Sequence, residues 1–143
     1  MITYMTGNIF DSPAQVLANP VNTKGVMGKG LALEFKRRFP EMFNAYKLAC
    51  REGIIKPGGY YLYHMSERDV MLVATKGDWR NPSKLEYIDK ALRDFTANFE
   101  RLAITSVAFP KLGCGCGGLD WDDVRPVMAR YLDPLPISVY VYI

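Results

Sequence analysis

The chain has 143 residues, of which 49% are hydrophobic and 23% are charged, and this balance is typical of one globular domain that buries a sizeable core. No run approaches the ~18 apolar residues of a membrane span, and the start MITYMTGNIF lacks the basic and apolar segments of a signal peptide, so we expect a cytoplasmic protein with no membrane partner. Three cysteines and one histidine argue against a disulfide framework and a zinc site, and the net charge of +3 tolerates a polyanionic partner without requiring one.

The N-terminal part is predicted to contain two short strands, a long loop and two helices. Apolar runs at 2–5 and 16–19 are of strand type and flank the turn-rich segment TGNIFDSPA. The loop NPVNTKGVMGKG follows, and then the stretch LALEFKRRF, whose apolar residues fall on one face of a helix. Pro40 opens a second helix, EMFNAYKLACREG, and Gly53 is its predicted stop.

The rest of the chain continues to alternate between strands and helices. The expected elements are strands at 58–65 and 70–75, a helix at 83–102, a strand at 104–109, a helix at 121–132 and a strand at 137–143. Asp120 is the predicted N-cap of the last helix, and Leu119 and Val124 have the spacing of a hydrophobic staple. Pro126 is expected to bend or shorten that helix.

This alternation predicts an α/β fold in which helices cover both faces of one sheet. Because no repeat, low-complexity tract or linker interrupts the chain, we expect residues 1–143 to form a single domain. Ligands of such sheets bind beyond the carboxyl ends of the strands. That rule nominates four segments, which are 6–9, 20–30, 75–84 and 110–118.

Two of these segments are rich in glycine and lead from a strand into a helix. The segment 110–118 has four glycines among nine residues, and its amides together with the helix N-terminus can hold a phosphate; the alternative is a merely tight turn. Gly25, Gly28 and Gly30 lead into the first helix at a spacing that matches neither a Walker loop nor G-x-G-x-x-G. Two such loops in a small domain suggest a pyrophosphate clamped from both sides.

The sequence resembles a known family in three segments. NPVNTKGVMGKGLALEFKRRFPEMF, ATKGDWRNPSKLEYI and FPKLGCGCGGLDWDDV look like the macrodomain of the DNA ADP-ribosyl glycohydrolase antitoxins. They are also similar, more distantly, to the terminal ADP-ribose protein glycohydrolase macrodomain of animals. The resemblance covers essentially the whole chain. It implies a three-layer α/β/α macrodomain with a mixed central sheet that binds ADP-ribose, without a metal or other cofactor, and cleaves its glycosidic bond to a nucleic-acid base or a protein carboxylate.

The resemblance implies that Lys76 is the catalytic residue, because relatives carry a catalytic lysine in a Thr-Lys pair at the end of a central strand. A neutral lysine amine can attack the anomeric carbon of a ribose, which behaves as a masked aldehyde. A lysine can also stabilise the leaving group electrostatically. Lys84 is the nearby competitor, but it begins a predicted helix and is expected on that helix's solvated face.

The resemblance and the two glycine-rich loops together nominate the residues that bind ADP-ribose. Asn8 stands where relatives carry an aspartate that accepts from adenine, and Asn22 is placed to bond a sugar hydroxyl, with a turn-forming role as its alternative. Tyr142 matches a tyrosine that lies against adenine, or else it is a core aromatic of the last strand. The full set is Asn8, Ile9, Asn19, Asn22, Gly28, Lys29, Gly30, Leu112, Gly113, Cys114, Gly115, Cys116, Gly117 and Tyr142.

Two departures from the relatives affect the predicted substrate. The antitoxins usually read His-Trp-Arg where this chain has Asp78-Trp79-Arg80, and Trp79 and Arg80 are candidates to contact the substrate base and a phosphate; a buried tryptophan and a surface arginine are the alternatives. The protein-directed animal enzyme carries an aspartate where this chain has Gly117. The missing carboxylate favours nucleic-acid substrates, or else a mechanism that uses the lysine alone.

The leading prediction is therefore an ADP-ribosyl glycohydrolase that removes ADP-ribose from thymidine or guanosine in modified DNA, with ADP-ribosylated protein as a further possible partner. A non-catalytic ADP-ribose reader is one alternative, although a reader has no evident need for Lys76. A phosphatase acting on ADP-ribose 1″-phosphate, or a deacylase acting on protein-linked ADP-ribose, is another. We expect a monomer, because no exposed heptad pattern is present.

Overall fold

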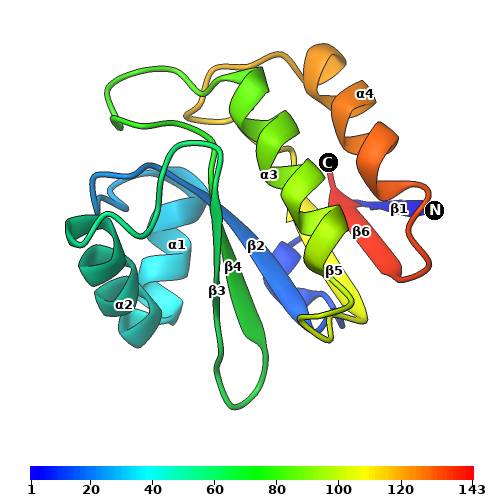
Figure 1. Cartoon of the computed structure of the whole chain (residues 1–143), viewed down its shortest axis with the longest axis horizontal. Coiled ribbons are helices and arrows are strands. Elements are labelled where there is room, and N and C mark those ends of the chain that lie inside the picture. The colour runs from blue at the N-terminus through cyan, green and yellow to red at the C-terminus, as the bar shows by residue number, and fades with distance from the viewer.

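The computed structural model describes all residues 1–143 and contains one six-stranded sheet in the order β1-β6-β5-β2-β4-β3 (Figure 1). The strands are β1 (Ile2–Met5), β2 (Val16–Val21), β3 (Tyr60–Tyr63), β4 (Asp69–Ala74), β5 (Ser106–Pro110) and β6 (Ser138–Tyr142). The helices are α1 (Gly30–Arg38), α2 (Pro40–Arg51), α3 (Leu85–Asn98) and α4 (Trp121–Leu132), with a short 3-10 turn η1 (Ile9–Asp11). Neighbouring strands are parallel except for β3 and β4, so the expected mixed sheet is confirmed.

Helices cover both faces of the sheet, as the alternation of elements predicts. Figure 1 shows α1 and α2 on one side of the strands and α3 and α4 on the other. Successive residues of β2 face opposite layers: Val16 and Ala18 pack with α3 and α4, whereas Leu17 and Val21 pack with α1 and α2. This two-residue period divides the apolar residues into two cores, and the three-layer α/β/α architecture is confirmed.

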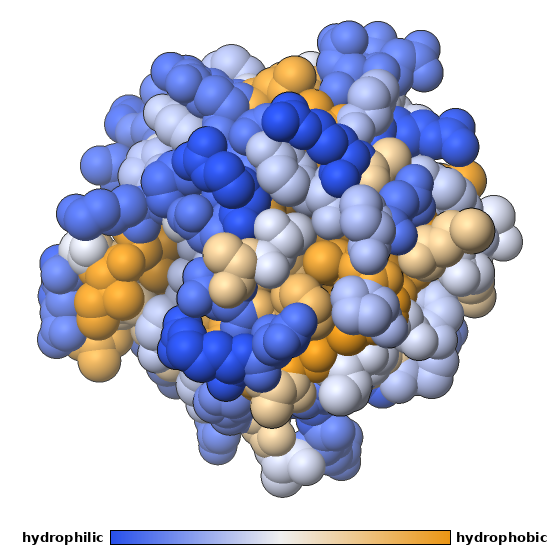
Figure 2. All heavy atoms as spheres, turned by 45° about the vertical axis from the view of Figure 1, so that its right-hand side comes forward, coloured by the Kyte–Doolittle hydropathy of each residue, from blue (hydrophilic) through white to orange (hydrophobic).

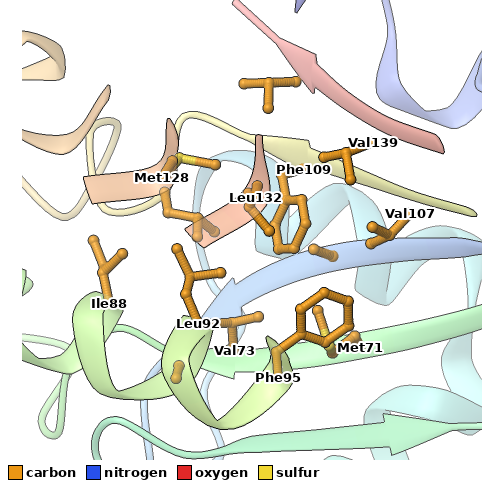
Figure 3. Close-up of a cluster of buried hydrophobic side chains, with 14 of the residues drawn as sticks. Met71, Val73, Ile88, Leu92, Phe95, Val107, Phe109, Met128, Leu132 and Val139 are labelled. Carbon is orange, nitrogen blue, oxygen red and sulfur yellow. The ribbon is translucent and has the colours of Figure 1, made fainter. Parts of the chain in front are cut away.

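The larger core lies between the sheet and the pair α3 and α4. Figure 3 shows Ile88, Leu92 and Phe95 projecting from α3 toward side chains of the sheet. Phe95 makes an edge-on contact with Phe109 of β5, with ring centroids 6.0 Å apart. The buried stripe predicted for this helix is therefore confirmed, although the helix spans 85–98 rather than 83–102.

Helix α4 bears on two predictions made from the sequence, its N-cap and the effect of Pro126. The Asp120 side chain caps the helix by accepting from the Asp122 N–H at 2.9 Å, as predicted. Helix α4 is not shortened at Pro126, because it continues to Leu132, and the bend given as the other outcome stays a prediction. The proline removes one backbone hydrogen bond near the start of the helix. Val124, Met128 and Leu132 keep the helix intact because they bury one continuous face at i, i+4 and i+8.

Six large hydrophobic residues are exposed, and they are Met1, Val26, Leu48, Ile54, Trp79 and Ile143. Figure 2 shows one face of the molecule, where hydrophilic residues surround several small apolar areas. None of the four helices has both the length and the apolar character that crossing a membrane would demand.

The parallel strands bring three connections to one edge of the sheet, the edge at which β2, β4 and β5 end. We call these connections the first glycine-rich loop (22–29), the lysine loop (75–84) and the second glycine-rich loop (111–120). They coincide with three of the four segments that the strand-end rule nominates.

Candidate functional site

A cavity of about 1000 Å³ opens at this edge of the sheet, between the three loops. Its volume lies at the upper end of the range for small-molecule sites. Most of the residues nominated from the sequence line it; they are Asn22, Gly28, Lys29, Gly30, Lys76, Trp79, Arg80, Gly113, Cys114, Gly115, Cys116, Gly117 and Tyr142. The fold thus gathers residues that are far apart in the chain around one space.

The charged groups in the cavity wall are all cationic. Lys29, Lys76, Arg80 and Lys111 line the cavity, and no aspartate or glutamate does so. Facing cations raise the positive potential of a concave site and attract phosphate groups. The wall therefore suits a ligand with two or more negative charges.

The second glycine-rich loop turns too tightly for a side chain at Gly117. A Cβ atom there would collide with the Ser83 Oγ atom and with the Gly113 carbonyl oxygen. No side chain, a carboxylate included, fits at Gly117 without a shift of this loop. The structure supplies a steric reason for the departure seen in the sequence.

The two glycine-rich loops meet across the cavity. A Cβ atom on Gly30, where φ is +56°, would lie 3.1 Å from the Cys116 Sγ atom, so this sulfur packs against the bare Cα atom of Gly30. Cys116 is exposed, whereas Cys114 is half-buried and burial raises the pKa of the Cys114 thiol. Cys114 therefore keeps its proton, and neither cysteine has a general base among the lining residues.

Lys76 lies two residues beyond the end of β4 and extends toward the second glycine-rich loop. Its Nζ atom donates to the Trp79 carbonyl and to the Cys116 carbonyl, both at 3.4 Å. One amine thus connects the lysine loop with the second glycine-rich loop at the cavity wall. Both hydrogen bonds are long, so little is given up when a substrate atom approaches the amine.

The lysine loop is held at both of its ends by buried groups. The Ser83 hydroxyl donates to the Thr75 hydroxyl at 3.0 Å, and both side chains are almost fully buried. The Lys84 N–H donates to the Thr75 carbonyl at 3.0 Å, and the Ser83 N–H donates to the Gly117 carbonyl at 2.8 Å. Lys84 itself is exposed at the start of α3, as the sequence predicts.

Trp79 and Arg80 lie at the cavity mouth on the same loop. Trp79 is 51% exposed, so the alternative of a buried tryptophan is wrong. The Arg80 guanidinium donates to both carboxylate oxygens of Asp78, at 3.0 and 2.7 Å, and lies 5.6 Å from the Trp79 ring. This hydrogen-bonded pairing holds the pKa of the Asp78 carboxyl well below its usual range.

Asn22 lines the cavity while its amide organises the first glycine-rich loop. The Asn22 Oδ1 atom accepts from the Lys24 N–H at 2.9 Å and from the Tyr46 hydroxyl at 2.8 Å, and Nδ2 donates to the Val26 carbonyl at 2.7 Å. Burial raises the pKa of the Tyr46 phenol, which therefore stays protonated and continues to donate. The turn-forming role given as the alternative for Asn22 is present in the structure.

Four nominated residues do not line the cavity. The Asn8 side chain caps η1 by accepting from the Phe10 N–H at 2.9 Å, and Ile9 is buried beside it. Asn19 is fully buried in β2, where its Nδ2 atom lies 3.8 Å from the Met27 sulfur and its Oδ1 atom has no hydrogen-bond partner. Leu112 is fully buried in the core. Their nomination for ADP-ribose binding stays a prediction.

The sequence interpretation did not single out several residues of the wall. They are Pro20, Val21, Val26, Leu31, Ala32, Thr75, Ser83, Pro110 and Lys111. Leu31 and Ala32 belong to the first turn of α1, where their apolar character indicates only a packed helix. Ser83 precedes a helix and therefore has the signature of an N-cap, yet the structure shows no side-chain cap on α3.

Known proteins resemble this chain in both sequence and fold. The family model of the Macro domain matches residues 18–128. The DNA ADP-ribosyl glycohydrolase of Mycobacterium tuberculosis is 45% identical over 147 residues, which cover 99% of this chain and 42% of that protein. This chain thus spans less than half the length of that relative.

Two solved structures agree closely with the fold. The macrodomain of Mycobacterium tuberculosis DarG gives a TM-score of 0.95 at 43% identity and covers 99% of this chain and 97% of that one. Thermosipho africanus DarTG in complex with ADP-ribose gives a TM-score of 0.96 at 37% identity and covers 99% of this chain and 41% of that one. Both the family resemblance and the macrodomain architecture expected from the sequence are confirmed.

Proposed function

Because this chain belongs to the macrodomain family, we propose that its cavity binds ADP-ribose and hydrolyses the bond between ADP-ribose and a base of modified DNA. One observation carries the proposal: a cationic cavity between two glycine-rich loops has a lysine at a strand end reaching across its wall. A relative named DNA ADP-ribosyl glycohydrolase and a structural neighbour in complex with ADP-ribose support it.

The two glycine-rich loops bind the pyrophosphate in this proposal. Their amides and the N-terminus of α1, which begins at Gly30, supply N–H donors for phosphate oxygens. Lys29 and Lys111 line the same cavity and offset the two negative charges. Binding therefore relies on backbone geometry and on cations rather than on a metal ligand set.

Lys76 performs the chemical step. Its neutral amine forms a C–N bond to the anomeric carbon while the bond from that carbon to the base breaks, and the base leaves with a proton from the lysine nitrogen, which becomes a neutral secondary amine. Water then hydrolyses the lysine adduct and releases ADP-ribose together with the free amine. Alternatively, the protonated amine stabilises charge on the leaving group while water attacks directly. In both forms Lys76 touches the reacting atoms.

Trp79 and Arg80 contact the substrate beyond the anomeric carbon. The exposed indole offers a stacking face for a base, which is worth about 1–3 kcal/mol in other single-strand sites. Arg80 is already paired with Asp78, so its remaining N–H groups are the ones available to a phosphate. The base contacts thus come from a loop different from those that bind the pyrophosphate.

The experiment offers purified protein thymidine-, guanosine-, glutamate- and phosphate-linked ADP-ribose in parallel. We expect turnover of a DNA-base linkage, loss of that turnover in Lys76→Ala, and ADP-ribose binding by calorimetry that the substitution leaves within a few-fold. Turnover by Lys76→Ala at the wild-type rate would contradict the lysine mechanism. Tight binding without turnover of any linkage would identify a reader, and phosphate release that survives Lys76→Ala would identify a phosphatase.

A further inference from the structure

A closed circuit of contacts connects the proposed catalytic lysine with the second glycine-rich loop and with the far end of its own loop. Lys76 donates to the carbonyl of Cys116, and the next residue along the chain, Gly117, accepts from the Ser83 N–H. Ser83 donates through its hydroxyl to Thr75, which immediately precedes Lys76. The circuit therefore passes from the lysine through the second glycine-rich loop and returns to the backbone that carries the lysine.

Ser83 is the residue at which the two loops are joined. It lines the cavity but is only 3% exposed, so its hydroxyl is inside the wall rather than at the surface. Cβ atoms built on Gly113 and Gly117 would both press against the Ser83 side chain. The second glycine-rich loop is thus packed around this serine at two positions, and a shift of Ser83 moves the carbonyl to which Lys76 donates.

The Ser83 hydroxyl makes no other hydrogen bond in the fold. Helix α3 has Lys84 as its N-cap residue and receives no side-chain hydrogen bond there. The hydroxyl instead satisfies the buried Thr75 hydroxyl, which points to a role within the loop pair.

We propose that Ser83 is a positioning residue that, through Thr75 and Gly117, sets the place of the backbone that carries Lys76 relative to the second glycine-rich loop. This inference rests on the proposed function of Lys76 and extends it to a residue that acts through that lysine. A displacement of a reacting group by ~1 Å can cost about 10²-fold in rate while the rest of the site still binds.

The test compares four variants by kcat and KM on an ADP-ribosylated oligonucleotide and by ADP-ribose affinity in calorimetry. Ser83→Ala and Thr75→Val each remove one hydroxyl of the pair, and Thr75→Ser retains it. Ser106→Ala is the matched control, because its hydroxyl accepts from the Gln15 N–H at 2.7 Å at the opposite end of the sheet. Proteins that melt below the assay temperature are compared at a lower temperature, so that only folded protein is measured.

We expect kcat to fall ~10- to 100-fold in Ser83→Ala and Thr75→Val, with KM and ADP-ribose affinity within about 3-fold of wild type. Thr75→Ser and Ser106→Ala should retain wild-type kcat. The double variant Ser83→Ala/Thr75→Val should lose no more than the worse single variant, because both substitutions break one contact. A Ser83→Ala kcat equal to that of Ser106→Ala, or equal losses in kcat and affinity, would overturn the proposal.

A second readout keeps this inference separate from the proposed activity. Reductive methylation with 13C-formaldehyde gives each lysine an NMR signal, and Lys76→Ala identifies the signal of Lys76. We expect that signal to shift in Ser83→Ala and Thr75→Val and to stay unchanged in Ser106→Ala. If wild type cleaves none of the linkages, the proposed function fails, whereas an unchanged Lys76 signal in both hydroxyl-deletion variants refutes the positioning role by itself.

Discussion

The two glycine-rich loops that face each other across the cavity are held in different ways. Side chains organise the first loop: the Asn22 amide bonds the loop's own backbone, and the Tyr46 hydroxyl reaches it from α2. The second loop is organised mainly by its backbone, through hydrogen bonds such as Leu119 N–H to the Gly113 carbonyl, together with close packing around Ser83. We therefore expect deletion of a polar side-chain group to disturb the first loop, and addition of a side-chain atom to disturb the second.

The largest effect is expected from adding one methyl group to the second loop. Gly117→Ala places a Cβ atom against the Ser83 hydroxyl and the Gly113 carbonyl, and overpacking of this kind costs about 1–3 kcal/mol. We expect a lower melting temperature and a loss of ADP-ribose affinity measured by calorimetry.

Gly115→Ala is the matched control for stability, since a Cβ atom at Gly115 meets nothing within 4 Å and Gly115 does not have a positive φ. If both alanine variants melt at the same temperature, the steric account of the second loop is wrong.

A smaller effect is expected from deleting one hydroxyl beneath the first loop. Tyr46→Phe removes the hydroxyl that lies 2.8 Å from both the Asn22 carbonyl oxygen and Oδ1, and the loss of one hydrogen bond costs about 0.5–1.5 kcal/mol because Oδ1 still accepts from the Lys24 N–H. Hydrogen exchange of the Lys24 amide should accelerate, because that amide donates to the same Oδ1 atom.

Tyr63→Phe serves as the control, because no hydrogen bond in the structure uses the Tyr63 hydroxyl and β3 lies at the far edge of the sheet. If hydrogen exchange in Tyr46→Phe accelerates in the second loop and not in the first, this account of how the two loops are held is wrong.

The smallest effect concerns the lysine loop, where Asp78 and Arg80 form an exposed pair. Because the pairing lowers the pKa of Asp78 in the folded protein, its contribution is present above the unfolded pKa and is lost as pH falls through the folded value. An NMR titration of the Asp78 carboxyl carbon should therefore have its midpoint well below that of an ordinary aspartate. Arg80→Ala should raise this midpoint toward the ordinary range, while the melting temperature at neutral pH changes little. An unchanged midpoint would show that another group holds the Asp78 pKa down.

Elements with strong local signals were predictable. The apolar period of α3, the Asp120 cap of α4 and the proline at the first position of α2 are each recorded within a few neighbouring residues. Pro126 does not shorten α4, because its local penalty is outweighed by a face of α4 that only the assembled core buries. Asn8 caps η1 with its side chain and does not line the cavity, and its nomination for ADP-ribose binding stays a prediction.

The sequence by itself determined that two glycine-rich loops and a lysine stand at strand ends, because parallel strands bring such ends to one edge. It also identified the family, through motifs that extend over most of the chain. Only the tertiary structure showed that Ser83 joins Thr75 to Gly117, and that Gly117 has no room for a side chain. Through Ser83 these contacts connect Thr75 with Gly117, which are 42 positions apart in the sequence. No local sequence pattern encodes them, because the two loops come together only when the sheet has formed.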